Sequence, residues 1–184
     1  MSPLIVVLII VAAVGLWIVG AYNALVRSRN RVKESWSDID VQLKRRYDLI
    51  PNLIETVKSY ASHEQKTLDM VIQARSRAMG AQTVAEHAQA ENMLSGALKS
   101  LFALSEAYPQ LRAVESFAKL QDELSDTENK IQAARRFYNT NVMSLNTQIE
   151  SFPTNLIAGQ FGFKKEEFFQ LENDKEREPV KVSF

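Results

Sequence analysis

The sequence predicts an all-α protein, in which an N-terminal transmembrane helix is followed by an elongated antiparallel helical bundle of about four helices, of the up-and-down type. Three observations support this prediction. An uncharged apolar run occupies residues 4–22. Further along, apolar side chains recur at steps of three and four, the period of a helix with one buried face. Six glycines and five prolines in 184 residues leave few interruptions to long helices.

The first predicted element is a membrane anchor over residues 1–26. A helix from residue 4 to residue 26 would be roughly 34 Å long, which is enough to cross a hydrocarbon core of about 30 Å. A cleaved signal peptide is the alternative, and it would have a basic start and an apolar stretch of only about 7 to 15 residues. Only Ser2 and Pro3 separate the initiator methionine from the apolar run. We therefore expect a retained single-pass anchor in the cell membrane.

Basic residues follow the apolar run directly, at Arg27, Arg29, Arg31 and Lys33. The positive-inside rule places such a flank in the cytoplasm, so the soluble domain is expected there, with the exported side as the alternative. A topology determinant is the plainer interpretation of these charges. They could also contact anionic lipid, gaining about 1 kcal/mol each. The lipid bilayer is the first predicted partner.

Composition limits the function further. The 22 basic and 22 acidic residues cancel, so bulk charge does not select nucleic acid as a partner. The absence of cysteine excludes disulfides, thiolate chemistry and cysteine-ligated zinc. No linker of Gly, Ser or Pro divides the chain. We predict one bundle domain over residues 27–170 and a charged, flexible tail over residues 171–184.

The first soluble helix should carry one long apolar face and end at Gly80. Pro51 interrupts this face. Asp48, three residues earlier, could cap a fresh helix that has Pro51 in its first turn, where the missing N–H of a proline costs little. We therefore expect a kink or short break at residues 47–51. The face comprises Trp36, Ile39, Leu43, Tyr47, Ile50, Ile54, Val57, Ala61, Leu68, Val71 and Ile72.

The next helix should begin at a capping box formed by Thr83 and Glu86 and should close at Pro109. The last long helix, from Gln110 to about Ser151, keeps strict three-four spacing, which is typical of a left-handed seam. Such a seam favours a homo-oligomer.

Three polar residues, Gln121, Glu128 and Arg135, lie seven apart on this seam. Each would cost several kcal/mol if it were buried without a partner. We expect a buried polar layer that fixes the register between helices. The alternative is a functional switch or a ligand site. The candidate partners on the first helix are Arg45, Arg46, Asp48, Asn52 and Arg75.

The C-terminal part is rich in phenylalanine. After a short helical turn at residues 155–158 come Phe161, Phe163, Phe168 and Phe169, which could contact a membrane or a partner. We favour rings that fold back over one end of the bundle. Val180, Val182 and Phe184 alternate with polar residues, so the tail could instead dock as a strand on a partner, unless it is disordered or packed on its own domain.

Two long motifs resemble the signatures of the LemA family, and the resemblance covers nearly the whole chain. The first runs from Lys44 to Leu53 and continues from Val57 to Glu64. The second runs from Leu120 to Ile131, with further matches up to Phe163. The polar positions of the two motifs, with the proline of the first, are expected to be structural: Arg46, Asp48, Pro51, Asn52, Gln121, Glu128, Asn129 and Arg135.

The resemblance implies a bacterial, membrane-attached, all-helical protein and brings no catalytic residue to carry over. Some relatives resemble lipoproteins with a cysteine before Tyr22-Asn23. This chain has Ala21 there, so it cannot be lipidated at that point.

No residue pattern indicates catalysis. The only histidines are His63 and His87, and Thr67 stands where a zinc-binding helix would need its second histidine. We predict no enzyme activity, no cofactor and no metal. The predicted function is a membrane-anchored scaffold or adaptor that binds a membrane protein not identified by the sequence. One alternative is a membrane-surface sensor or lipid-remodelling protein that uses the basic flank and the phenylalanines. Another is a bundle with a ligand or catalytic site around Glu128 and Arg135.

Overall fold

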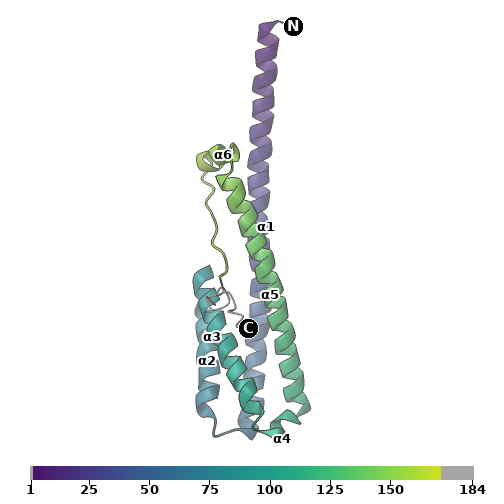
Figure 1. The fold of residues 1–184 in the computed structure, drawn as a ribbon, viewed down its shortest axis with the longest axis vertical. Coiled ribbons are helices and arrows are strands. Elements are labelled where there is room, and N and C mark those ends of the chain that lie inside the picture. Colours follow the sequence, from purple (N-terminus) through teal and green to yellow (C-terminus); the bar gives the residue numbers. More distant parts are fainter. Residues whose placement is uncertain (1, 171–184) are drawn as a thin grey trace, which may run out of the picture. The chain divides into compact units, whose positions relative to one another are not determined.

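The computed structural model describes residues 2–170, which form six helices and no strand (Figure 1). The helices are α1 (Pro3–Tyr60), α2 (Gln65–Gly80), α3 (Val84–Ser105), α4 (Pro109–Arg112), α5 (Glu115–Glu150) and α6 (Thr154–Gln160). The prediction of an all-α fold is confirmed. The predicted tail strand at Val180, Val182 and Phe184 lies outside the described residues.

Helix α1 contains the apolar N-terminal run and continues without interruption for 58 residues. At about 1.5 Å per residue its length is roughly 87 Å. Within residues 2–170 it is the one helix long and apolar enough to cross a membrane, and none of these residues buries its apolar window. The apolar helix predicted at the N-terminus is therefore present.

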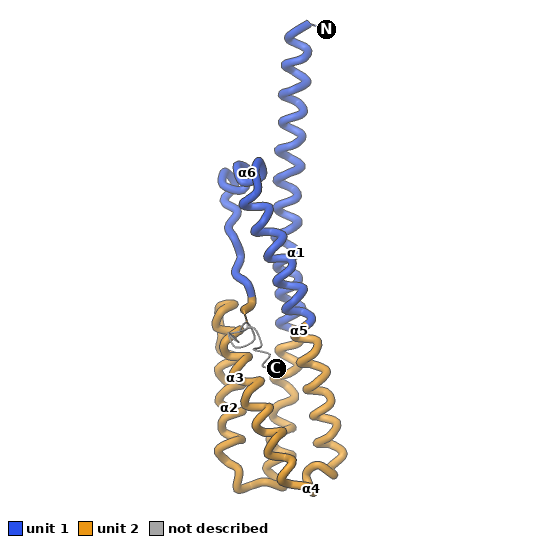
Figure 2. Tube along the Cα trace, in the orientation of Figure 1, with its two compact units in different colours: residues 1–40, 133–168 blue, residues 41–132, 169–184 orange. Residues whose placement is uncertain are grey.

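The described chain divides into two compact units (Figure 2). The first unit comprises residues up to Asp40 together with 133–168, and the second comprises residues 41–132 together with Phe169 and Gln170. Both α1 and α5 contribute to each unit. The second unit also contains α2, α3 and α4, whereas α6 belongs to the first.

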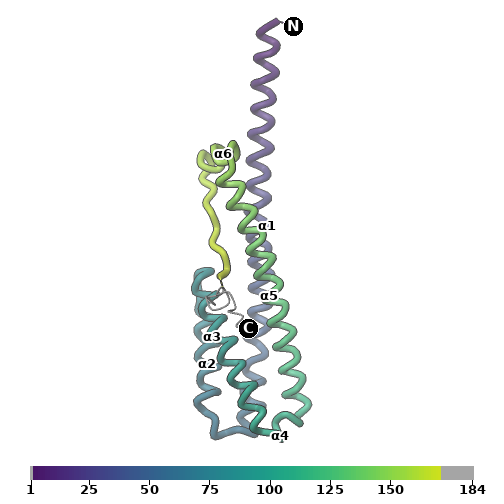
Figure 3. Tube along the Cα trace, viewed as in Figure 1, coloured from purple at the N-terminus to yellow at the C-terminus, as the bar shows by residue number. Residues whose placement is uncertain are grey.

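The core of the second unit is built largely from the predicted apolar faces, although Ile72, expected on the first of them, is 46% exposed, and Leu53, not expected there, is buried. In Figure 3, α2 and α3 run in opposite directions after a short loop, which brings their apolar faces together. The fully or nearly fully buried side chains include Leu43, Ile50, Leu53 and Val57 of α1, Leu68 and Val71 of α2, Leu94 and Leu101 of α3, and Phe117 and Leu124 of α5. Burial of each such side chain stabilises the fold by about 1.5–3 kcal/mol.

The break expected at residues 47–51 is absent, because α1 continues through Pro51 and ends only at Tyr60. Pro51 has no N–H to donate to the carbonyl of Tyr47, four residues earlier. Arg75 of α2 supplies the missing donor, with its Nε 2.9 Å from the Tyr47 carbonyl oxygen. The chain turns instead at residues 61–64, and Asp48 is an exposed residue inside α1 rather than a cap.

The ends of α3 and α5 differ in how well they were predicted. The capping box at Thr83 and Glu86 is present, and the backbone N–H groups of Gln82 and Thr83 hold the pKa of Glu86 below its usual value. Pro109 opens the short helix α4 instead of closing α3. The predicted last helix is therefore split, because α5 starts only at Glu115.

In the first unit, a polar contact joins α1 to α5. The Ser28 hydroxyl and the Gln148 side-chain amide exchange hydrogen bonds of 2.8 and 3.0 Å. The segment after α6 returns along α5, where Asn146 both donates to the carbonyl of Glu166 and accepts from its N–H at 2.9 Å. An ion pair of 2.6 Å between Lys165 and Glu150 reinforces this contact. The segment 161–168 is thus fixed to α5 mainly through its backbone.

Candidate functional site

A buried cluster of charges lies in the second unit. The Nη1 atom of Arg46 on α1 is 3.1 Å from Oε2 of Glu91 on α3 and 2.8 Å from Oε2 of Glu128 on α5. The side chains of Arg46 and Glu91 are only 2% and 0% exposed, whereas that of Glu128 is 30% exposed. One guanidinium therefore ties three helices together away from water.

Two neutral groups complete the hydrogen bonding of this Arg46 cluster. Nη2 of Arg46 donates to the Ser95 hydroxyl at 2.8 Å, and the Tyr47 hydroxyl donates to the second carboxylate oxygen of Glu91. Buried charges are tolerated only when they are paired and hydrogen-bonded. Here the side chains satisfy one another within the protein, so the cluster serves the fold before any ligand is considered.

Sequence reasoning named Glu128 as a seam residue and Arg46 as one of five candidate partners, but it did not assign the pair. It also missed Glu91, Ser95 and Tyr47 as parts of the cluster. A signal for Glu91 was available. It stands three residues before Leu94 and seven before Leu98, which places a carboxylate on the apolar stripe of α3. A charge at such a position requires a buried partner of opposite charge.

A groove of about 280 Å³ opens beside the Arg46 cluster, between α3 and α5. Gln121, Glu128 and Asn129 all line it. The expected burial of Gln121 is wrong, because this residue is exposed at the groove. Phe102 and Lys99 of α3 line the same groove, so this seam position faces an open groove and not a packed helix.

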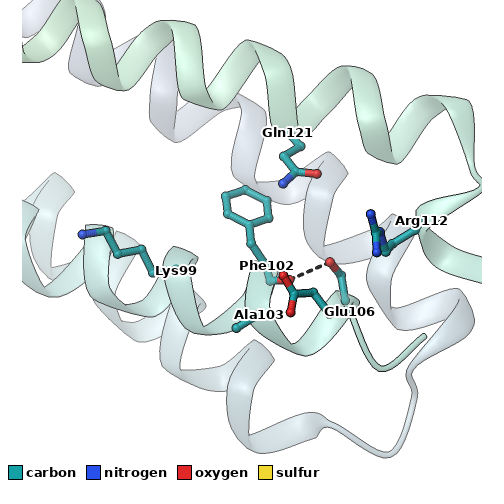
Figure 4. Close-up of a pocket in the computed structure, with 7 residues that line it drawn as sticks. Lys99, Phe102, Ala103, Glu106, Arg112 and Gln121 are labelled. Carbon is teal, nitrogen blue, oxygen red and sulfur yellow. Dashed lines mark hydrogen bonds between the residues drawn. The ribbon is translucent and has the colours of Figure 1, made fainter. Parts of the chain in front are cut away.

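A neighbouring pocket of about 350 Å³ is shown in Figure 4. Gln121 lies across this pocket from Phe102 and Glu106, while Lys99 and Arg112 lie at its two ends. The ring of Phe102 meets that of Phe117 edge-on, with 6.4 Å between centroids. The pocket therefore has an aromatic side chain in its middle, packed on Phe117, and a basic side chain at each end. These lining residues form no catalytic arrangement.

The other predicted positions are scattered. Asp48, Pro51 and Asn52 are exposed on α1, while Arg135 is buried in the first unit. Pro51 lines a third groove, of about 370 Å³, between α1 and α2. That groove also includes Ile54, Glu55, Lys58, Ile72 and Arg75.

Aromatic residues gather in the first unit at the end of the apolar run. The ring of Tyr22 lies 4.9 Å from that of Phe161 and 5.8 Å from that of Phe163. The Arg29 guanidinium carbon lies 5.2 Å from the centroid of the Phe163 ring, a cation–π contact. Phe161 is therefore packed against α1 and still half exposed.

The remaining predicted contact residues divide between surface and core. Arg27, Arg31, Lys33 and Phe168 are exposed, as a membrane or partner contact requires. The prediction that Phe169 is a surface contact is wrong, since only 2% of this residue is exposed. Its burial agrees with the expectation that some of these rings fold back onto the bundle.

Tyr138 on α5 has a strongly perturbed environment. Its ring meets that of Trp36, and its hydroxyl donates to the Glu167 carbonyl at 3.0 Å. Burial, with repulsion from Glu166 and Glu167, raises its pKa to about 12 from the ordinary value of 10.0. The folded protein therefore keeps this proton longer than the unfolded chain does.

We expect Tyr138 to contribute stability that is complete below pH 10 and is lost as the pH rises toward 12. A Tyr138→Phe variant should lack the part of the phenolate absorbance that appears nearest pH 12. Its stability should also fall less steeply over that range. An ultraviolet titration of the full chain and the variant in detergent checks this. If the absorbance missing from the variant were instead lost near pH 10, the raised pKa of Tyr138 would be contradicted.

No group of three or more His, Cys, Asp or Glu residues that could hold a metal is found among the described residues. The fold and the site together define the class of protein: an all-helical protein whose first helix carries a candidate membrane span and whose bundle is tied by a buried arginine and two glutamates. The chain belongs to the LemA family, whose model matches residues 35–184.

Comparison with individual proteins gives the same placement. The chain is 29% identical over 169 residues to Protein LemA of Metamycoplasma hominis, covering 90% of this chain and 75% of that protein. It is 24% identical to Magnetosome protein MamQ 2 of Paramagnetospirillum magneticum and 23% identical to Magnetosome protein MamQ of Magnetospirillum gryphiswaldense. These matches cover 81% and 80% of this chain but only 64% of each magnetosome protein. None of these names is that of an enzyme.

Proposed function

We propose that this chain is a membrane-anchored, non-enzymatic scaffold or adaptor that assembles proteins at the bacterial membrane, with its soluble part in the cytoplasm. The observation that carries the proposal is the continuity of α1. The same helix contains the exposed apolar run and the buried side chains Leu43, Ile50 and Leu53. No loop separates the candidate anchor from the bundle residues that it would hold at the membrane.

The state of the buried polar groups also supports a scaffold. Arg46 is shared between Glu91 and Glu128, and Tyr47 donates to Glu91. A general acid, base or nucleophile needs a group within reach of a substrate. The charges at the centre of this bundle are instead used to hold its helices.

The surface of the bundle offers a site for a protein partner. Ile72 of α2 is about half exposed and lines the groove between α1 and α2 together with Pro51 and Ile54. Met79, two turns further along α2, is exposed as well. Glu55, Lys58 and Arg75 surround the groove with charge. An apolar centre with a polar rim is the usual composition of a protein interface, and methionine adapts to partners of different shape.

Site-specific crosslinking in cells tests the proposal. A photoreactive side chain replaces Ile72 or Met79 in the full chain, and Ser100, an exposed polar residue of α3, is the matched control. We expect adducts with a membrane protein or a second copy of the chain at the two α2 positions and none at position 100. If neither α2 position gives an adduct in membranes that contain the full chain, the scaffold proposal is wrong.

The side of the membrane requires a separate measurement. Reporters that are active only in the cytoplasm or only outside it, fused after Phe184, should show activity in the cytoplasm. This expectation follows from the four basic residues between Arg27 and Lys33. Activity of the external reporter alone would reverse the orientation and leave the anchor unaffected.

The groove beside the Arg46 cluster supports a second candidate function, binding of a small polar ligand. The partly exposed carboxylate of Glu128 and the side chains of Gln121 and Asn129 would provide acceptors and donors. An Asn129→Trp variant fills this groove from its exposed rim. Loss of function in the cell with the α2 crosslinks intact would favour a ligand site, whereas unchanged function would favour the scaffold alone.

A further inference from the structure

The corner between α5 and α6 exposes large apolar side chains. Phe152 is 80% exposed and Leu156 is 62% exposed, whereas Ile157 and Ala158 on the inner side of α6 are buried. Apolar area in water costs about 25 cal/mol per Å². A cluster of such residues, in contrast to a single one, marks a surface that another phase or molecule covers.

The position of this corner indicates what covers it. Tyr22 ends the apolar run of α1 and contacts both Phe161 and Phe163, which follow α6 directly. Figure 1 shows α6 beside α1, and beyond α6 the N-terminal part of α1 continues with no other described element of the first unit next to it. The exposed corner therefore lies level with the end of the candidate membrane span.

The charges around the corner have the sign expected at a lipid surface. Arg27, Arg29 and Arg31 follow the span, and Arg29 packs on the ring of Phe163. Lys164 adds an exposed positive charge in the returning segment. Aromatic rings at the end of a span, flanked by basic residues, are typical of the boundary between hydrocarbon and headgroups in an anionic leaflet.

We propose that the α5–α6 corner, residues 151–161, is a second membrane-contact element that lies in the headgroup region of an anionic bilayer. The side chains of Phe152 and Leu156 enter the acyl boundary there, beside the end of the α1 span. Lipid is the occupant because the corner is continuous, through Tyr22, with the apolar run of α1. The proposal rests on the membrane anchor of the proposed function, and its test separates the two.

Single-cysteine spin labelling of the full chain provides that test. The natural sequence has no cysteine, so every introduced one is unique. Leu16→Cys reports on the span, and Phe152→Cys and Leu156→Cys report on the corner. Phe137→Cys is the matched control, because this phenylalanine is 54% exposed and lies about 20 Å back along α5. All four positions are exposed, so the fold should tolerate the label, and circular dichroism verifies this.

The labelled chains are reconstituted in vesicles of phosphatidylcholine with a minority of phosphatidylglycerol. Collision of the nitroxide with oxygen, which concentrates in lipid, is compared with collision with a water-soluble nickel chelate. We expect the oxygen preference at positions 16, 152 and 156 to exceed that at position 137 by several-fold. Omitting phosphatidylglycerol should reduce the preference at positions 152 and 156 and leave position 16 unchanged.

Every other result counts against the proposal in a distinguishable way. Oxygen preference at position 16 with water-like values at positions 152 and 156 would overturn the corner contact and keep the anchor. Water-like values at position 16 would overturn both. Shielding of positions 152 and 156 from both reagents would show that a protein surface, and not lipid, covers the corner. Equal preference at positions 137 and 152 would attribute insertion to the label itself.

Discussion

An Arg46→Met variant should lose about 3–5 kcal/mol of its free energy of unfolding, because breaking a buried ion pair leaves an uncompensated charge. In this chain that charge is on Glu91, whose side chain is fully buried, and Glu128 loses its partner at the same time. Methionine retains much of the apolar volume, so the loss reports on charge rather than on a cavity. Urea unfolding of the full chain in detergent, followed by circular dichroism, measures it.

Two further variants keep this prediction specific. Arg45→Met changes the neighbouring exposed arginine and should alter stability by no more than about 0.5 kcal/mol. Arg46→Met combined with Glu91→Gln removes the two fully buried charges, and the glutamine amide oxygen can still accept from Tyr47. This double variant should therefore recover most of the stability lost in Arg46→Met. If Arg46→Met were no less stable than Arg45→Met, the cluster would not be what ties the three helices.

The second large effect concerns Pro51. Because Arg75 donates to the Tyr47 carbonyl that Pro51 leaves without a helical donor, Arg75→Met should cost about 1–3 kcal/mol. Pro51→Ala restores the backbone N–H and should stabilise the chain, by up to about 3 kcal/mol. In the Pro51→Ala background the cost of Arg75→Met should shrink, since the alanine N–H then bonds to Tyr47.

A double-mutant cycle over these four proteins isolates this coupling, again by urea unfolding. Arg77→Met is the control, as Arg77 is exposed two residues further along α2. A cost of Arg75→Met that is equal in both backgrounds would show that Arg75 acts through packing or general charge. It would also leave the continuity of α1 through Pro51 without an explanation.

The elements that sequence periodicity predicted best are those whose signal is local. The apolar run, the faces of α1, α2 and α3, and the capping box at Thr83 each depend on residues within a few turns of one another. The break at residues 47–51 was wrongly predicted because the compensating donor, Arg75, comes from another helix. Nothing in the local pattern of a proline indicates that a distant guanidinium will replace its missing hydrogen bond.

In the candidate site, too, local features could be predicted and contacts between helices could not. Spacing placed Glu128 on the seam of the last long helix, and Arg46 was one of five candidate partners on the first helix. The position of Gln121 on the same seam suggested burial, but the groove between α3 and α5 at which it is exposed depends on how two helices pack. Spacing along one helix cannot report the distance to the next. The partners Glu91 and Ser95 likewise depend on the register between α1 and α3.

The contact of Asn146 with the peptide group of Glu166 has a consequence for tolerated change. The side-chain amide of Asn146 bonds only to the main chain of residue 166. It donates to the carbonyl and accepts from the N–H. Related sequences can therefore vary freely at position 166, apart from proline, which has no N–H to offer. They cannot exchange Asn146 for aspartate, which has no donor, or for leucine, which has neither donor nor acceptor. Substitutions should therefore accumulate faster at position 166 than at position 146.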